Sequence, residues 1–228
     1  MKTAFILATV AASATAFAPS SLKAVKTSSL SMSEAPVEPV EPPKPAYPTL
    51  NGWTADPKAF CAGLPGSVAP LGQFDPAGFT KEMGVGPIKK LREAEVTHGR
   101  VGMLAVVGYL VGENFHPLFN GAVTGPANSH LAQVQEVAPF FFAWLVGSIM
   151  TAELGRAKIG WKSPTDQTFT LKSNYYPGDI GFDPFGLKPT GAKDFAEMQT
   201  KELNNGRLAM IAAIGMIGQE LVTGKTLF

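Results

Sequence analysis

The sequence predicts an all-α membrane protein with three transmembrane helices, in which helices 1 and 3 form a crossed pseudo-twofold pair and helix 2 lies alongside. Three observations lead to this fold class. First, one helical segment occurs twice in the sequence. Second, the sequence lacks strand signals such as alternating runs of β-branched residues between hairpin turns. Third, Lys and Arg are distributed unevenly between the two connections that join the helices. The 228 residues suffice for one such unit plus removable N-terminal material.

The repeat relates residues 95–113 to residues 202–220 at an offset of 107, and seven of the 19 positions are identical: Glu95, Gly99, Arg100, Met103, Ala105, Gly108 and Glu113. Each copy follows the same loop motif, Phe-Asp-Pro-x-Gly, in residues 74–78 and 182–186. Because one helix separates the copies, both would cross the membrane in the same direction, as parallel repeats do.

The apolar pattern places the helices at about residues 88–114, 135–157 and 197–222. Their uncharged stretches of 12, 16 and 12 residues are shorter than the about 20 residues of a membrane span, so core helices of a soluble protein are the alternative. Membrane helices are favoured because the connection 115–133 carries no charge, whereas the connection 155–196 carries six Lys and Arg residues. Glycine and alanine also recur along the repeated helices, as they do where helices approach closely in lipid.

The N-terminal region has the composition of targeting segments. An apolar run ends at the small-x-small pattern Ala14-Thr15-Ala16, and the serine-rich stretch that follows contains no acidic residue before Glu34. We expect residues 1–33 to be a signal peptide plus plastid transit peptide, residues 34–64 a Pro-rich stromal arm and N-terminal loop, and residues 65–228 the functional domain. An ordinary secreted protein is the alternative, but it leaves the serine-rich continuation unexplained.

Composition disfavours several classes of function. The net charge of +1 predicts no strong attraction to nucleic acid, and the one cysteine, Cys61, excludes an intramolecular disulfide. A soluble helical enzyme that uses Glu95 and His98 as acid and base is an alternative. However, the sequence has no glycine-rich phosphate loop, metal-spaced histidine pair or nucleophile motif to support it.

The charged starts of the repeated helices predict two reciprocal ion pairs. Glu95 and Arg100 are five residues apart, about 140° around a helix, so they do not share a face. We therefore expect Glu95 to pair with Arg207 and Glu202 to pair with Arg100, since a guanidinium grips a carboxylate bidentately. If the pairs are buried, removing one partner would cost about 3–5 kcal/mol. The alternative is two exposed helix-start pairs, worth about 0.3 kcal/mol each.

Three neutral donors lie isolated on the apolar helices. His98 and its repeat counterpart Asn205 each follow a glutamate by three residues, and Gln219 lies about four turns beyond Asn205 near the same face. Polar groups within a membrane are functional by default, and isolated donors suit a metal that needs only one axial ligand. A structural histidine is the alternative for His98. A glutamate neutralised by an arginine, such as Glu95 or Glu202, could serve in the same way.

The two signatures at residues 95–105 and 202–210 resemble those of the chlorophyll a/b-binding light-harvesting family. The loops, Gln219 and residues 176–184 agree, and the resemblance covers about residues 65–224. With its leader, the chain resembles in particular the fucoxanthin–chlorophyll a/c antenna proteins of red-lineage secondary plastids. The resemblance implies five axial ligands of chlorophyll magnesium: Glu95, His98, Glu202, Asn205 and Gln219.

The resemblance also implies that two loops hold the ends of two central carotenoids: Phe74, Asp75 and Pro76 in the first, and Phe182, Asp183 and Pro184 in the second. Glu153, near the end of helix 2, is a further candidate chlorophyll ligand, with an interfacial carboxylate as the alternative. Chlorophyll magnesium would be the only metal.

The implied function is a non-enzymatic antenna of the plastid thylakoid membrane, with a stromal N-terminus. It would bind chlorophyll a, chlorophyll c and fucoxanthin or related xanthophylls, and pass excitation to photosystem I or II beside other antenna subunits. Residues 201–210 and 125–127 also resemble the stress-related branch of the family, so energy dissipation on the same scaffold is the main alternative. A small repeat transporter is a remote one, because the middle segments 106–109 and 213–216 offer little to a substrate.

Overall fold

The computed structural model of the protein describes residues 47–227. The expected leader (residues 1–33) lies outside the described residues, and so do residues 34–46 of the expected arm. The described chain forms four α-helices: α1 (Val85–Asn114), α2 (Ala127–Val137), α3 (Phe141–Gly160) and α4 (Ala192–Thr223). Between residues 47 and 227 there is no β-strand, only two isolated bridges, so the all-α prediction is confirmed.

The predicted helices 1 and 3 correspond to α1 and α4, with slightly wider bounds than expected. Pro87 stands in the first turn of α1, where its missing N–H costs no helical hydrogen bond. At the end of α4, Gly224 adopts the left-handed conformation with φ of 64° and donates its N–H to the carbonyl of Glu220. Glycine tolerates this conformation best, so α4 ends there.

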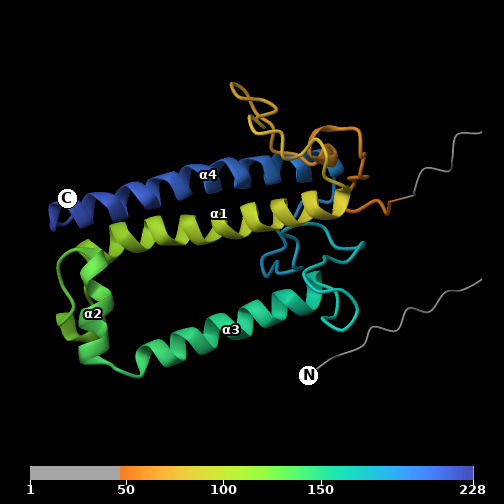
Figure 1. Ribbon diagram of the computed structural model, residues 1–228. Coiled ribbons are helices and arrows are strands. Elements are labelled where there is room, and N and C mark those ends of the chain that lie inside the picture. Colours follow the sequence, from red (N-terminus) through yellow and green to blue (C-terminus); the bar gives the residue numbers. More distant parts are fainter. Residues whose placement is uncertain (1–46, 228) are drawn as a thin grey trace, which may run out of the picture. The chain divides into compact units, whose positions relative to one another are not determined.

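Helices α1 and α4 run side by side in the same direction (Figure 1). They approach closely at two equivalent positions of the repeat. A Cβ atom on Gly99 would lie 3.0 Å from the Cα of Gly206, and a Cβ atom on Gly206 would lie 2.9 Å from the Cα of Gly99. Because Cβ atoms rarely come this close to another backbone, glycine at both positions permits the crossing.

The predicted continuous helix over residues 135–157 is wrong at its start. Helix α2 ends at Val137 and α3 begins at Phe141, with Pro139 between them. Proline disfavours helical geometry in the residue before it, and Ala138 has φ of −140° and ψ of 78°. Among residues 47–227, no helix alone is both long and apolar enough for a membrane span; α2 and α3 satisfy that test only together, as a pair bent by 113°.

Helix α3 presents apolar side chains to its surroundings rather than to the rest of the chain. Gly160 is its only buried residue, and its exposed large apolar residues include Phe141, Trp144, Leu145, Val146, Ile149, Met150, Leu154 and Ile159. Apolar residues are also exposed along α1 and α4, among them Leu104 and Ile211. Exposed apolar surface on this scale marks contact with a lipid, a ligand or a partner.

A small hydrophobic core lies where the N-terminal segment meets the start of α1. Six buried residues form it: Ala55, Ala62, Leu64, Val85, Ile88 and Tyr176. Trp53 and Phe195 pack their rings edge-on against Tyr176, at centroid distances of 5.7 and 5.4 Å. The segment from residue 47 onward is therefore folded against the helices, which anchors the loops that flank the crossing.

Candidate functional site

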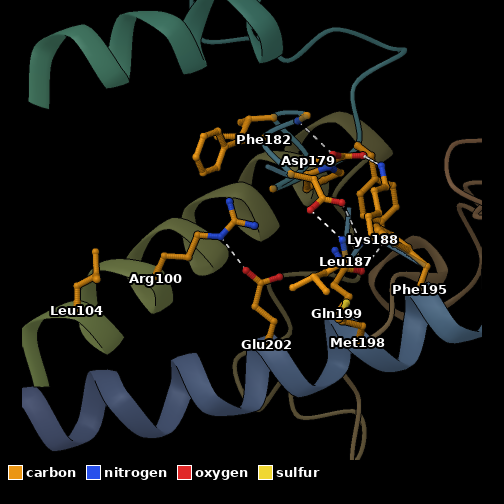
Figure 2. Close-up of a pocket in the computed structure, with 16 residues that line it drawn as sticks. Arg100, Leu104, Asp179, Phe182, Leu187, Lys188, Phe195, Met198, Gln199 and Glu202 are labelled. Atoms are coloured by element: carbon orange, nitrogen blue, oxygen red, sulfur yellow. Dashed lines mark hydrogen bonds and ion pairs between the residues drawn. The ribbon is translucent and has the colours of Figure 1, made fainter. Parts of the chain in front are cut away.

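Glu202 of α4 meets Arg100 of α1. Nε of Arg100 donates to Oε1 of Glu202 at 2.7 Å. Figure 2 shows the two side chains reaching toward each other from facing helices. This contact is one of the two ion pairs that the repeat led us to expect.

Glu95 of α1 meets Arg207 of α4 in the reciprocal pair. Oε1 of Glu95 lies 2.7 Å from both Nε and Nη2 of Arg207, and Nη1 of Arg207 donates to the Gly66 carbonyl at 2.7 Å. A second cation, which the sequence reasoning missed, lies on α1 itself: Nε of Arg92 is 3.1 Å from Oε2 of Glu95. The signal for it was the spacing of three residues, which makes the two side chains neighbours on a helix.

The ion pairs are less buried than expected. The exposed fraction of the four side chains that form them lies between 29% and 40%, because each pair borders an open groove. In the chain alone, the loss of one partner should therefore cost about 1–3 kcal/mol, below the about 3–5 kcal/mol of a fully buried pair.

The hydrogen bond of His98 determines which of its ring nitrogens can act as a ligand. Nδ1 lies 2.8 Å from the carbonyl oxygen of Ala94, one turn earlier. A carbonyl can only accept, so Nδ1 carries the proton and Nε2 keeps a lone pair. His98 is exposed, and the hydrogen bond orients its ring, as a bond from the nitrogen that does not bind the metal orients histidine ligands.

The other three candidate ligands are also exposed. The side-chain amides of Asn205 and Gln219 make no hydrogen bond to any part of the chain that the structure describes, so their oxygens are available. Glu153 is 51% exposed and accepts from Nη2 and Nε of Arg156 at 2.6 and 3.0 Å. Within residues 47–227 no three His, Cys, Asp or Glu residues gather to hold a metal ion, so the donors are isolated.

The two Phe-Asp-Pro loops form the same turn. The N–H of Gly78 donates to the carbonyl of Asp75, and that of Gly186 to the carbonyl of Asp183, at 3.2 and 3.4 Å. Both glycines have positive φ, of 69° and 64°. Aspartate first, proline second and glycine fourth is the favoured order for a type I turn. Phe74 and Phe182, the first residues of the motifs, stay exposed.

The aspartates stabilise their turns through their carboxylates. Asp75 accepts from the N–H groups of Phe79 and Thr80 and from the Thr80 hydroxyl; Asp183 accepts from the N–H groups of Leu187 and Lys188. The side-chain hydrogen bond from Thr80 is the largest cause that lowers the pKa of Asp75, and the backbone hydrogen bond from Lys188 is the largest for Asp183. Each carboxylate thus stays ionised to a lower pH than a free aspartate does.

Each loop borders one groove that also contains one ion pair. A groove of about 860 Å³ is lined by Arg100, Glu202 and Phe182, and Leu104 and Met198 supply apolar walls (Figure 2). A smaller groove of about 470 Å³ is lined by Glu95, Arg207 and Phe74. Both are mainly apolar and open on one side, so each can hold an elongated apolar ligand end beside a neutralised carboxylate.

Glu93 was missed by the sequence reasoning, although it is among the most buried charged groups described. It is 3% exposed and accepts from Nη1 of Arg156 at 3.0 Å, the Tyr175 hydroxyl at 3.0 Å and the N–H of Gly178 at 2.6 Å. Burial and the Glu93 charge raise the pKa of Tyr175. This network fastens α3 to α1, and the only hint of it in the sequence was the charged residue Arg156 on an apolar helix.

Glu113 and Glu220, identical in the repeat, lie at the other ends of α1 and α4. They are 7% and 3% exposed. Glu113 accepts from the N–H of Leu227, and Glu220 from the N–H of Asn128, at 2.9 and 2.8 Å. They tie the C-terminal segment and the first turn of α2 to the paired helices, and we had assigned them no role.

Known proteins are similar to this chain over most of the residues described above. The chlorophyll A-B binding protein family matches residues 60–221. The light-harvesting complex stress-related protein 3.2 of Chlamydomonas reinhardtii is 48% identical over 177 residues, which cover 75% of this chain and 67% of that protein. The fucoxanthin-chlorophyll a-c binding protein of Isochrysis galbana is 47% identical over 176 residues, which cover 73% and 80%. Both relatives are named chloroplastic. The chain belongs to the chlorophyll a/b-binding protein family.

Proposed function

We propose that this protein is a light-harvesting antenna that binds chlorophylls and carotenoids and passes their excitation energy to a photosystem. The observation that carries the proposal is the pair of reciprocal carboxylate–guanidinium contacts between α1 and α4. They leave two neutralised carboxylates beside apolar grooves on a scaffold whose remaining donors are isolated. Such a scaffold suits holding pigments at set separations, and like its family it performs no bond chemistry.

The residues present fit the needs of chlorophyll magnesium, which has four ring nitrogens and takes one further donor. His98 offers Nε2, Asn205 and Gln219 offer amide oxygens, and Glu95 and Glu202 offer carboxylates already neutralised by arginine. Glu153, neutralised by Arg156, would be a further ligand on α3. The bound chlorophyll would supply the light absorption; the chain supplies axial donors, spacing and an apolar setting.

The two grooves fit the ends of carotenoids. Each joins a Phe-Asp-Pro turn to one side of the crossing, and the exposed rings of Phe74 and Phe182 give each turn an apolar surface. Phe74, Asp75 and Pro76 would hold one carotenoid end, and Phe182, Asp183 and Pro184 another. We propose chlorophyll a, chlorophyll c and fucoxanthin or a related xanthophyll as the pigments, because a relative at 47% identity is named for fucoxanthin and chlorophylls a and c.

For the membrane arrangement we propose that α1, α3 and α4 span the plastid thylakoid membrane. Their exposed apolar side chains and the Lys- and Arg-rich connection between α3 and α4 support this topology, with the N-terminus on the stromal side. Residues 1–33 would be removed as a leader. A photosystem I or II core and other antenna subunits would be the partners.

The decisive experiment refolds the chain in detergent with chlorophyll a, chlorophyll c and fucoxanthin, and measures absorption and pigment stoichiometry. We expect a coloured complex, from which His98→Leu loses about one chlorophyll. His130→Leu is the matched control, because it removes an imidazole with the same kind of carbonyl contact, from Nε2 to Gly125 at 3.0 Å, but from α2 rather than from a repeated helix. A colourless, detergent-independent wild-type protein would refute the antenna function, and an unchanged stoichiometry in His98→Leu would refute the ligand.

Dissipation of excess excitation is the second candidate function, since the 48% identical relative is named as stress-related. Harvesting and dissipation use the same pigments on the same scaffold, so a measurement on the excited state separates them. The chlorophyll fluorescence lifetime of the complex should shorten between pH 7.5 and about pH 5 if the chain dissipates energy; a lifetime that is independent of pH assigns it to harvesting.

A further inference from the structure

The two repeat carboxylates, Glu95 and Glu202, have unequal surroundings. Both oxygens of Glu95 face guanidinium groups: Oε1 lies 2.7 Å from Nε and Nη2 of Arg207, and Oε2 lies 3.1 Å from Nε of Arg92. Glu202 has one such partner, Arg100, which approaches Oε1 at 2.7 Å. Oε2 of Glu202 makes no hydrogen bond or ion pair within the described residues.

The difference comes from one position of the repeat. Arg92 lies three residues before Glu95, and Gln199 lies three residues before Glu202. The amide oxygen of Gln199 accepts from the hydroxyl of Tyr176, in the interior next to the second loop. The side chain of Arg92 is only 7% exposed and also donates through Nη1 to the Pro65 carbonyl. Arg92 is therefore held in place beside Glu95 and cannot drift into solvent.

The two carboxylates consequently differ in charge and in donor strength. Two guanidinium groups around Glu95 leave a local excess of one positive charge, whereas Arg100 and Glu202 sum to zero. A carboxylate with hydrogen-bond or ion-pair partners on both oxygens is a weaker electron donor to a metal than one with a free oxygen. A buried charge also sets up a field that water screens only in part.

We propose that Arg92 tunes the chlorophyll held by Glu95, so that this pigment absorbs at a different energy from the pigment held by Glu202. The proposal rests on the antenna function proposed above and assigns a specificity-determining role to a residue outside the set of ligands. A fixed charge near a chlorophyll ring changes the energies of its ground and excited states by unequal amounts. The energy at which the ring absorbs therefore shifts. An energy difference between two pigments at symmetric places would give excitation a preferred direction across the helix pair.

The test compares Arg92→Gln and Arg92→Lys in the full chain refolded with chlorophyll a, chlorophyll c and fucoxanthin. Arg92→Gln removes the charge, so one red chlorophyll band should shift while the number of bound chlorophylls stays the same. Arg92→Lys keeps the charge and should leave that band close to its wild-type position. The band is assigned by the paired variant Glu95→Leu/Arg207→Leu, which removes the ligand together with one of its two cations and so keeps the local excess of one positive charge.

Three outcomes would overturn the proposal: an unchanged red absorption spectrum in Arg92→Gln, a shift of equal size in Arg92→Lys, or loss of a chlorophyll from Arg92→Gln, which would make Arg92 a holding residue instead. Gln199→Arg is the reciprocal check, because it places a cation beside Glu202. The absorption band of the chlorophyll at Glu202, assigned as the band lost in Glu202→Leu/Arg100→Leu, should then shift. A wild-type chain that binds no chlorophyll would refute the antenna function, a result distinct from wild-type pigment binding with an insensitive Arg92.

Discussion

The first half of the repeat, residues 74–113, and the second half, residues 182–220, build the same local parts. Both have the aspartate-stabilised turn, a glycine at the crossing and a glutamate that pairs with the opposite arginine. Among the positions at which they differ, two adjacent ones change the tertiary contacts: Arg92 and Glu93 in the first half correspond to Gln199 and Thr200 in the second. Arg92 donates to the Pro65 carbonyl of the N-terminal loop and Glu93 accepts from Arg156 of α3, and neither Gln199 nor Thr200 makes such a contact within the described residues.

The comparison separates two kinds of contact. Contacts between the halves repeat: Gly99 contacts its own copy, Gly206, and the Glu95–Arg207 ion pair has its copy in the Glu202–Arg100 pair. Contacts to elements outside the repeat do not. The carboxylate of Glu93 accepts a hydrogen bond from Arg156 of α3, whereas the Thr200 hydroxyl donates to the carbonyl of Ala196 in its own helix. The near-symmetric pair therefore carries an asymmetric environment, so pigments at equivalent places need not behave alike.

The largest difference between the halves is expected at positions 93 and 200. Glu93→Ala would leave Arg156, the Tyr175 hydroxyl and the Gly178 N–H without their shared acceptor. We expect it to lower the free energy of unfolding by about 3–5 kcal/mol, as loss of one partner of a buried ion pair does. The matched change Thr200→Ala should cost at most about 0.5 kcal/mol. Denaturant unfolding of the refolded complexes measures both, and equal costs would contradict the asymmetry.

The crossing itself should be the next most sensitive feature, and here the halves should agree. Gly206→Ala places a Cβ atom 2.9 Å from the Cα of Gly99, where only backbone movement can relieve the clash. The expected loss is about 1–3 kcal/mol, the usual cost of overpacking. Gly215→Ala is the control on the same helix, because its Cβ atom would meet nothing within 4 Å. Thermal unfolding in detergent compares the two; a Gly206→Ala protein as stable as the control would refute close packing at the crossing.

Removing the arginines should again destabilise the two halves by unequal amounts. Arg100→Leu leaves Glu202 with no guanidinium partner, whereas Arg207→Leu leaves Glu95 beside Arg92. We expect Arg100→Leu to cost about 1–3 kcal/mol in unfolding free energy and Arg207→Leu about 1 kcal/mol less. Urea titrations measure the difference. Adding Glu202→Leu to Arg100→Leu should recover most of the loss; an equal loss from either arginine alone would contradict a second partner at Glu95.

The smallest effect concerns the two loop aspartates. Both have a pKa below the ordinary 3.8. Since the folded value is the lower one, their stabilisation is complete above the ordinary value and is lost as the pH falls through the depressed values. Only Asp75 has a hydroxyl donor, because Lys188 replaces Thr80 in the second loop. Thr80→Val should therefore raise the pKa of Asp75 and leave that of Asp183 unchanged in a carbon-13 NMR titration. Equal shifts at both would show that the loops are coupled.

The repeat made much of this structure predictable. Seven identities at one offset implied a symmetric helix pair, and the five-residue spacing of Glu95 and Arg100 excluded pairing within one helix, so the reciprocal partners followed. The turns were recognisable because aspartate, proline and glycine each suit one place in them. These features depend on helix periodicity and local backbone preferences, which adjacent residues determine.

Other features depended on elements far apart in the chain. The break at Pro139 was readable in the sequence, but the apolar run across it outweighed the proline in our prediction of a single helix. The contacts of Glu93 with Arg156 and of Gln199 with Tyr176 could not be predicted, because each depends on how a loop or α3 packs. Arg92 beside Glu95 and Arg156 beside Glu153 were overlooked, although a spacing of three residues makes both pairs neighbours on a helix. Neither could the partial exposure of the ion pairs, because exposure depends on what covers a side chain.

The sequence by itself thus determined the all-α class, the repeated pair of helices and the reciprocal partners of Glu95 and Glu202, because the helical period and the duplication fix which side chains share a face. Only the tertiary structure decided which extra charges surround each half and how α3 is attached, because those contacts join elements whose relative positions no local pattern encodes.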